Sequence, residues 1–272
     1  MPNHYDYSSG TCDGGIFTYE KTTGHFLRTA REDPLVLDNR APGITLDCAN
    51  ACSSLGSDCP SFSLDYGGQR CFKNDRNTQG RGDSLAPRDG TNYFEKVCLR
   101  GEISGCRDKA WAFERMPGFQ LVGHNHKELQ NVPSRRDCEE YCLQERGFPC
   151  RSAEYNAVTL DCVLSRETRR TQPGDFREAR DVDYLENGCI ATSDLDCPYQ
   201  RTDNAYPRYL DTIVNDVKDE VACEVQCTYY EQFICRSFAF YASANQCFIS
   251  GDDRGMYYND DNSPVIHLMH GR

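Results

Sequence analysis

The chain has 272 residues, of which 38% are hydrophobic, 26% are charged and 17 are cysteines, and its formal net charge is -12. So little apolar material disfavours a single large core, and the acidic excess disfavours nucleic acids and anionic membranes as main partners. Small modules held by covalent cross-links need less apolar material, and cysteine use on this scale is typical of proteins that pass through an oxidising secretory route.

The sequence shows neither a membrane-spanning segment nor a signal peptide. No apolar run is long enough to span a bilayer, so we expect no membrane insertion within this segment. The N-terminal Met1-Pro-Asn-His-Tyr-Asp lacks the charged and apolar regions of a signal peptide. We therefore expect the chain to be processed or to be part of a longer protein, secreted or the ectodomain of a membrane-anchored one.

The cysteines fall into three groups with nearly the same internal spacing. Three residues always separate the second and third cysteines, eleven separate the fourth and fifth, and 26 separate the fifth and sixth in both complete groups. The groups are Cys12, Cys48, Cys52, Cys59, Cys71 and Cys98; Cys106, Cys138, Cys142, Cys150, Cys162 and Cys189; and Cys197, Cys223, Cys227, Cys235 and Cys247. The same interval places a missing sixth cysteine just past Arg272. We therefore expect a truncated third module in which Cys197 is unpaired, the alternative being a free reactive thiol or an intermolecular bridge.

Each group predicts one helix, because two cysteines at i and i+4 lie on one helical face. The helices are expected around the CxxxC pairs Cys48–Cys52, Cys138–Cys142 and Cys223–Cys227. Ser134 and Asp137 have the form of a capping box before the second helix, and Asp219 can cap the third. Thr45 or Asp47 is the nearest capping residue for the first.

Short strands are expected after each helix, and each pair is separated by a turn typical of a hairpin. They are expected at residues 62–66 and 70–73, 153–155 and 162–164, and 238–241 and 247–249. Residues 113–122 are predicted to form a further hairpin, with its turn at Pro117-Gly118. The simplest module is therefore one helix packed on a short antiparallel sheet, which makes the fold class α+β.

A CxxxC helix, a following hairpin and an outer cysteine pair resemble the PAN/apple module. The blocks Cys235-Arg-Ser-Phe and Cys247-Phe-Ile-Ser carry the resemblance together with the six-cysteine spacing. The three copies cover residues 12–98, 106–189 and 197–272, the last without its sixth cysteine.

The spacing alone leaves 15 pairings open for each six-cysteine module. The resemblance implies nested bridges from first to sixth, second to fifth and third to fourth cysteine. The implied pairs are Cys12–Cys98, Cys48–Cys71, Cys52–Cys59, Cys106–Cys189, Cys138–Cys162, Cys142–Cys150, Cys223–Cys247 and Cys227–Cys235.

Residues 111–118 (Trp-Ala-Phe-Glu-Arg-Met-Pro-Gly) and 121–123 (Leu-Val-Gly) are most similar to tandem modules that precede zona pellucida domains. Proteins of that kind occur in the apical extracellular matrix and cuticle of arthropods and nematodes. The resemblance implies a non-catalytic region that contacts matrix proteins or glycans. The alternative is a partner-recruiting region of a secreted protease or growth factor.

Arg81-Gly82-Asp83 is a second binding hypothesis, because integrins recognise this tripeptide in exposed loops. A solvated polar loop is the other interpretation, since neither of the other modules repeats the motif.

No catalytic motif holds the Ser, His and Asp residues, so we predict neither an enzyme nor a cofactor. The absence of CxxC pairs argues against zinc, and the segment with His124 and His126 is interpreted as a surface loop. Tyrosines such as Tyr229 and Tyr230 are candidates for stacking on sugars or for protein contacts, with ordinary core packing as the alternative. The basic residues between Arg166 and Arg170 could meet a sulfated glycan, although a solvated loop is favoured.

Overall fold

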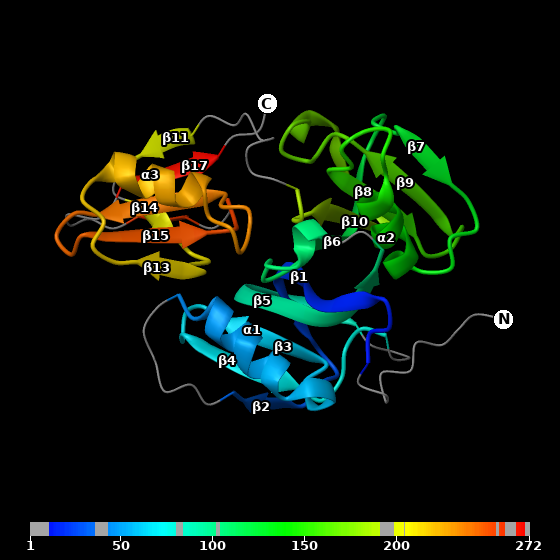
Figure 1. The fold of residues 1–272 in the computed structure, drawn as a ribbon, viewed down its shortest axis with the longest axis horizontal. Coiled ribbons are helices and arrows are strands. Elements are labelled where there is room, and N and C mark those ends of the chain that lie inside the picture. Colours follow the sequence, from blue (N-terminus) through cyan, green and yellow to red (C-terminus); the bar gives the residue numbers. More distant parts are fainter. Residues whose placement is uncertain are drawn as a thin grey trace. The chain divides into compact units, whose positions relative to one another are not determined.

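The protein is described by a computed structural model, which covers residues 11–35, 43–79, 84–101, 104–190, 199–203, 205–253, 256–258 and 265–269. Its described residues form two compact units: 11–23 with 94–190, and 24–93 with 199–269. Helices and strands are both present in each unit, so the predicted α+β class is confirmed (Figure 1).

The first unit is a sheet covered by one helix. The strand order is β5-β1-β6-β10-β8-β9-β7, with β1 parallel to β6 and β6 antiparallel to β10. The elements are β1 Gly15–Leu27, β5 Leu85–Arg100, β6 Phe113–Leu121, β7 Lys127–Leu129, α2 Arg135–Gln144, β8 Ser152–Asn156, β9 Asp161–Ser165 and β10 Phe176–Asn187. Strands β1 and β5 each contribute residues to both units. The core beneath α2 combines its cysteines with Phe113, Leu164 and Leu185, all 1% exposed or less.

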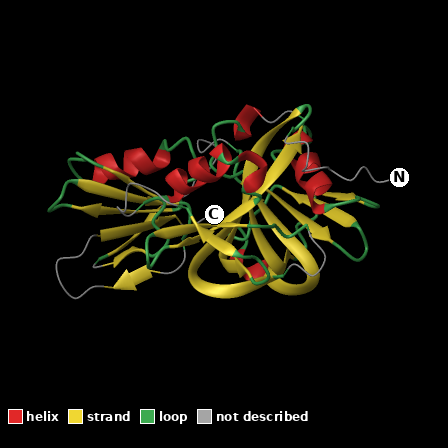
Figure 2. Ribbon diagram, turned by 90° about the horizontal axis from the view of Figure 1, so that it is seen from below, coloured by secondary structure: helices red, strands yellow, loops and turns green. Residues whose placement is uncertain are grey.

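The second unit contains the other two helices. Its strands follow the orders β2-β4-β3-β5, β11-β17-β14-β15-β13 and β12-β16. The further elements are β2 Glu32–Pro34, α1 Thr45–Ser54, β3 Ser61–Asp65, β4 Arg70–Asn74, β11 Tyr199–Thr202, β12 Ala205–Pro207, β13 Thr212–Val214, α3 Glu220–Thr228, β14 Ser237–Tyr241, β15 Gln246–Ser250, β16 Met256–Tyr258 and β17 Val265–Met269. Each predicted hairpin after a helix is present, as β3–β4, β8–β9 and β14–β15. Helix α1 packs against β3, α2 against β8 and α3 against β14, each within its own unit. Figure 2 distinguishes helices from strands by colour.

The helices begin where side chains satisfy free main-chain N–H groups, with one exception. Ser134 accepts a hydrogen bond from the N–H of Asp137 at 3.2 Å, and Asp219 accepts one from the N–H of Ala222 at 2.7 Å. Helix α1 has Ile44 at this position and no side-chain cap. The prediction that Thr45 or Asp47 caps α1 is therefore wrong, because the Thr45 hydroxyl donates to Asp211 instead.

Eight disulfides tie each described helix to its hairpin and close two of the repeats. The inner two of each set join the helix to the second hairpin strand and to the loop before the first strand, which fixes the main packing interface of a module with little core. The pairs are Cys12–Cys98, Cys48–Cys71, Cys52–Cys59, Cys106–Cys189, Cys138–Cys162, Cys142–Cys150, Cys223–Cys247 and Cys227–Cys235. Cys197 lies outside the described residues.

Residues 113–122 do not form the predicted hairpin. They are one strand, β6, which pairs with β10 on both sides of Pro117. Gly118 adopts φ 79°, and the register shifts in β10 between Glu178 and Asp183. The Pro117-Gly118 pair thus lies at an irregularity between two paired strands, and not in a hairpin turn.

Candidate functional site

The first unit contains a buried network of charges around helix α2. The guanidinium of Arg135 donates to both carboxylate oxygens of Glu20, at 2.9 and 3.2 Å, and to Asp183 at 3.2 Å. Arg115 pairs with the same Asp183 at 2.9 Å. Buried charges need such pairing, because an unpaired one would carry its full cost of desolvation. The network therefore attaches α2 to strands β1 and β10.

Two buried carboxyl groups of this network have pKa values that are shifted in opposite directions. Burial and the nearby Glu20 carboxylate raise the pKa of Glu139 well above its usual value, although Arg136 acts against this. Glu20 is buried as well, but Arg135 holds its pKa well below the usual range, assisted by a hydrogen bond from Glu139. Glu139 also forms an ion pair with Arg136, and the pKa values of the two buried carboxyl groups are shifted in opposite directions. This arrangement stabilises the fold and leaves neither group facing a ligand.

The last two residues of the segment Arg166–Arg170 are buried, so they are neither part of a solvated loop nor available to a glycan. Arg169 and Arg170 are each 8% exposed. Arg169 contacts Glu114 at 2.9 Å, and both arginines pair with Glu186. The interpretation of this segment as a solvated loop is therefore wrong there, because both guanidinium groups are buried among carboxylates.

In the histidine segment, His124 contacts an acidic side chain. The Nε2 atom of His124 lies 2.9 Å from a carboxylate oxygen of Asp175. Nearby, burial raises the pKa of Glu154 to about 7, while the N–H of Leu121 and the charge of His124 oppose the rise. Among the described residues, no group of three or more His, Cys, Asp and Glu side chains could hold a metal ion.

A cavity of about 220 Å³ lies in the first unit, beside the bridges Cys106–Cys189 and Cys142–Cys150. Its polar lining is already engaged within the protein. Asn187 donates to the carbonyl of Cys150 and accepts from the N–H of Cys189, both at 2.8 Å. Glu145 accepts from Lys127 at 2.6 Å. The cavity therefore offers little polar recognition to a small molecule.

The sequence-predicted adhesion motif Arg81-Gly82-Asp83 lies outside the described residues. None of the described helices has the length and apolar character needed to cross a membrane.

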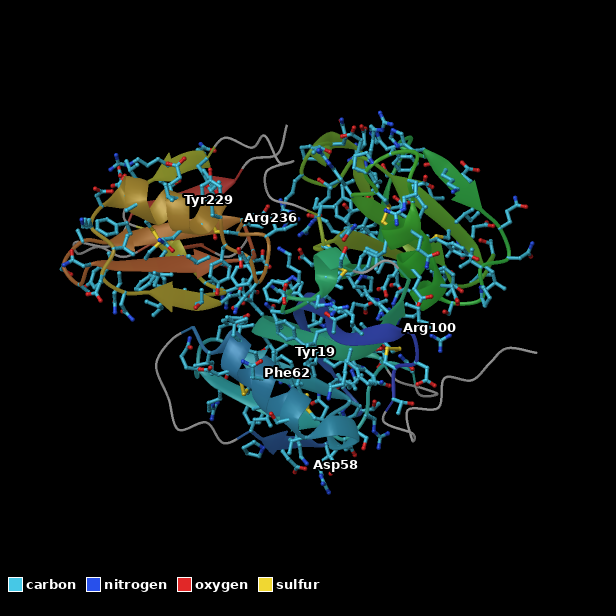
Figure 3. All side chains as sticks on the ribbon, in the orientation of Figure 1. Tyr19, Asp58, Phe62, Arg100, Tyr229 and Arg236 are labelled. Carbon is cyan, nitrogen blue, oxygen red and sulfur yellow. A yellow bond between two sulfur atoms is a disulfide. The ribbon has the colours of Figure 1, made fainter. Side chains whose placement is uncertain are left out.

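The exposed surface of helix α3 carries apolar side chains. Val221, Val225 and Tyr229 are 69%, 48% and 73% exposed (Tyr229 is labelled in Figure 3). Val221 and Val225 lie within α3 and Tyr229 is its C-cap residue. Their four-residue spacing makes one stripe, on the side opposite Cys223 and Cys227. We call these three residues the α3 stripe.

The sequence interpretation considered the tyrosines but missed the two valines of the α3 stripe. Tyr229 is indeed exposed, whereas Tyr230 packs against Phe233 with ring centroids 4.6 Å apart. Counting helical positions from Cys223 would have placed Val221 and Val225 on the outer face, so the signal was present in the spacing.

Comparisons with known proteins give the family of the chain. The family model described as "PAN domain" matches residues 106–189 and 197–269, which together are more than half of the chain. A search of curated protein sequences finds no match. Among solved structures, the chain is similar to the solution structure of the two N-terminal apple domains of Toxoplasma gondii microneme protein 4. The sequence identity is 14%, the match covers 61% of this chain and 88% of that chain, and the TM-score is 0.22.

PAN domains are non-catalytic modules that bind proteins or carbohydrates, and together with the disulfides they indicate an extracellular protein. The chain belongs to the PAN domain family.

Proposed function

We propose that this chain is a non-catalytic interaction region of an extracellular protein, and that it contacts proteins or glycans within an apical extracellular matrix or cuticle. The observation that carries the proposal is the contrast between a cross-linked interior and an apolar outer surface. Buried arginines and glutamates of the first unit form ion pairs with each other, whereas the large side chains of the α3 stripe lie on the surface. Grouped exposed apolar residues mark interaction sites more often than catalytic ones.

The resemblance of residues 111–118 to modules that precede zona pellucida domains supports the matrix as the setting. The domain limits 12–98, 106–189 and 197–272 remain part of this proposal, and each module is expected to present its own surface.

The proposal is tested by immobilising the oxidised chain and measuring its binding to extracted apical matrix proteins and to a glycan array. We expect saturable binding that is lost after reduction and alkylation of the cysteines, because the surface depends on the cross-linked fold. Equal binding before and after reduction, or no binding to either class, would contradict the proposal.

A further inference from the structure

Helices α2 and α3 are equivalent elements of two repeats. Each cysteine of the second repeat from Cys138 to Cys162 has its counterpart 85 positions later, ending at Cys247. The same offset relates the residues on the face of each helix that points away from its CxxxC cysteines, which we call the outer face. These are Arg136, Glu140 and Gln144 of α2, and Val221, Val225 and the C-cap residue Tyr229 of α3.

On α2, this outer face binds an extended segment of polypeptide. The main-chain N–H of Arg100, the last residue of β5, donates to Glu140 at 2.9 Å. The side-chain amide of Gln144 donates to the main-chain carbonyl of the same Arg100 at 3.5 Å. Both main-chain groups of one strand residue are therefore bound by the helix (Arg100 is labelled in Figure 3).

The contact continues on both sides of Arg100. Towards the start of the helix, Arg136 lies 3.9 Å from the carboxylate of Glu95. After the strand, Gly101 adopts φ 98°, and a Cβ atom there would lie 2.5 Å from the side-chain nitrogen of Gln144. The segment from Glu95 to Gly101 thus follows the helix, and the positive φ of Gly101 favours a glycine where the segment ends.

On α3, the equivalent face is exposed and apolar. The fold does not require this, since α2 has polar residues at these positions and α1 has the exposed polar residues Asn50 and Ser54. Valine is also a poorer helix former than most residues. The two exposed valines Val221 and Val225 therefore gain nothing for the helix itself, which points to a role outside the fold.

The surroundings of the α3 stripe are acidic. Four carboxylates and two basic side chains lie on or beside the helix at exposed or half-buried positions: Lys218, Asp219, Glu220, Glu224, Glu231 and Arg201, which pairs with Glu220 at 3.6 Å. An apolar stripe with an acidic border complements a segment whose apolar side chains are flanked by basic ones.

We propose that the α3 stripe docks an extended segment of a partner protein, one with apolar side chains flanked by Lys or Arg, in the way that α2 docks the end of β5. The inference rests on the proposed binding function and assigns it a surface and a class of partner. From Val221 to Tyr229 the stripe spans eight residue steps, about 12 Å, and an extended segment of about four residues spans the same length.

Two other occupants fit the surface less well. A second copy of this chain would bring a net charge of -12 to an acidic border, which opposes association. A glycan could stack on the Tyr229 ring, but the branched side chains of Val221 and Val225 offer a sugar neither a flat face nor a hydrogen bond.

The test is a selection of phage-displayed random peptides of about twelve residues on the oxidised full chain, followed by titration of the enriched synthetic peptide. We expect apolar residues flanked by Lys or Arg, with binding at least about tenfold weaker in Val221→Glu and Val225→Glu. The matched control is Val158→Glu, since Val158 is 72% exposed on a hairpin turn outside α3. This control should bind like the parent chain, and circular dichroism should show that all variants are folded.

Several results would overturn the inference. These are failure to enrich any peptide, enrichment of acid-flanked peptides, or equal binding to the parent chain and Val225→Glu. A dimer in sedimentation that Val225→Glu dissociates would assign the face to a second copy, and glycan-array binding lost only in Tyr229→Ala would assign it to a sugar. If matrix binding persists in Val225→Glu, the proposed function stands and this inference alone fails.

Discussion

The hydroxyl of Thr45 donates a hydrogen bond to the carboxylate of Asp211 at 2.8 Å, although 166 residues separate them in the sequence. Asp211 is fully buried, and it also accepts from the Tyr66 hydroxyl and from the N–H of Gly251, each at 2.8 Å. One carboxylate therefore satisfies three buried donors within the second unit, which predicts that its removal is costly.

The variant Asp211→Ala leaves these donors without an acceptor, and we expect it to lower the free energy of unfolding by about 3 kcal/mol or more. Urea unfolding followed by circular dichroism measures the loss. Asp203→Ala is the control, because Asp203 is 68% exposed and paired only with another exposed side chain. Similar losses for the two variants would show that the Asp211 hydrogen bonds contribute little.

The two carboxyl groups around α2 should respond differently to neutralisation. Glu20→Gln removes the charge that Arg135 binds, and we expect a loss of about 3–5 kcal/mol. Glu139→Gln should cost clearly less, because burial raises the pKa of Glu139 and so favours its neutral form. Trp111 is 5% exposed in the same unit, so its fluorescence during urea unfolding reports on both variants. A larger loss for Glu139→Gln would contradict the opposite directions of the two pKa shifts.

Glu154 should make the first unit less stable as the pH rises. Its pKa is raised from 4.5 to about 7 by burial, so the folded state binds this proton more tightly than the unfolded state. The stabilisation from this proton is fully present below pH 4.5 and is lost as the pH rises to about 7.

The variant Glu154→Gln removes this titration. We expect its stability relative to the parent chain to improve between pH 4.5 and pH 8, by about 3 kcal/mol at most. Trp111 fluorescence in urea at both pH values gives the difference, and a constant difference would contradict the raised pKa.

The bridge Cys138–Cys162 ties helix α2 to strand β9. Replacing both cysteines by alanine should cost about 2–5 kcal/mol and shift the Trp111 unfolding midpoint strongly. The matched variant replaces Cys223 and Cys247, the equivalent pair of the second unit, and should shift that midpoint less. Equal shifts would mean that the two units unfold together.

Much of the fold could be predicted because cysteine spacing constrains local structure strongly. The CxxxC pairs predicted all three described α-helices, and strand-like segments separated by turn residues predicted the hairpins that follow them. The eight disulfides coincide with the pairs that the family resemblance implied, a choice that spacing alone did not allow.

The errors share a physical origin, which is that they concern partners distant in sequence. The Pro117-Gly118 pair is a turn signal by local rules, but pairing with β10 on both sides of it keeps β6 extended. Thr45 looked like a cap, yet its hydroxyl has a buried acceptor elsewhere. The parallel pairing of β1 with β6 had no local signal at all.

The basic segment was also misinterpreted because its partners are distant in sequence. Arg169 and Arg170 were interpreted as solvated because acidic residues flank them in sequence, whereas their actual partners are Glu114 and Glu186 on strands β6 and β10. The α3 stripe, in contrast, needed only helical geometry to be found, because exposure on a helix is set by position relative to the buried cysteines.

The Cys106–Cys189 bridge has a mechanical consequence. It joins residues 83 positions apart, with their Cα atoms separated by 4.6 Å. A pulling force that enters at Cys106 therefore leaves at Cys189 through one covalent bond, and the chain between them carries no load. The enclosed segment could otherwise extend by roughly 270 Å at 3.3 Å per residue. As long as the bridge is oxidised, stretching cannot unravel this module, and its surfaces keep their form under tension.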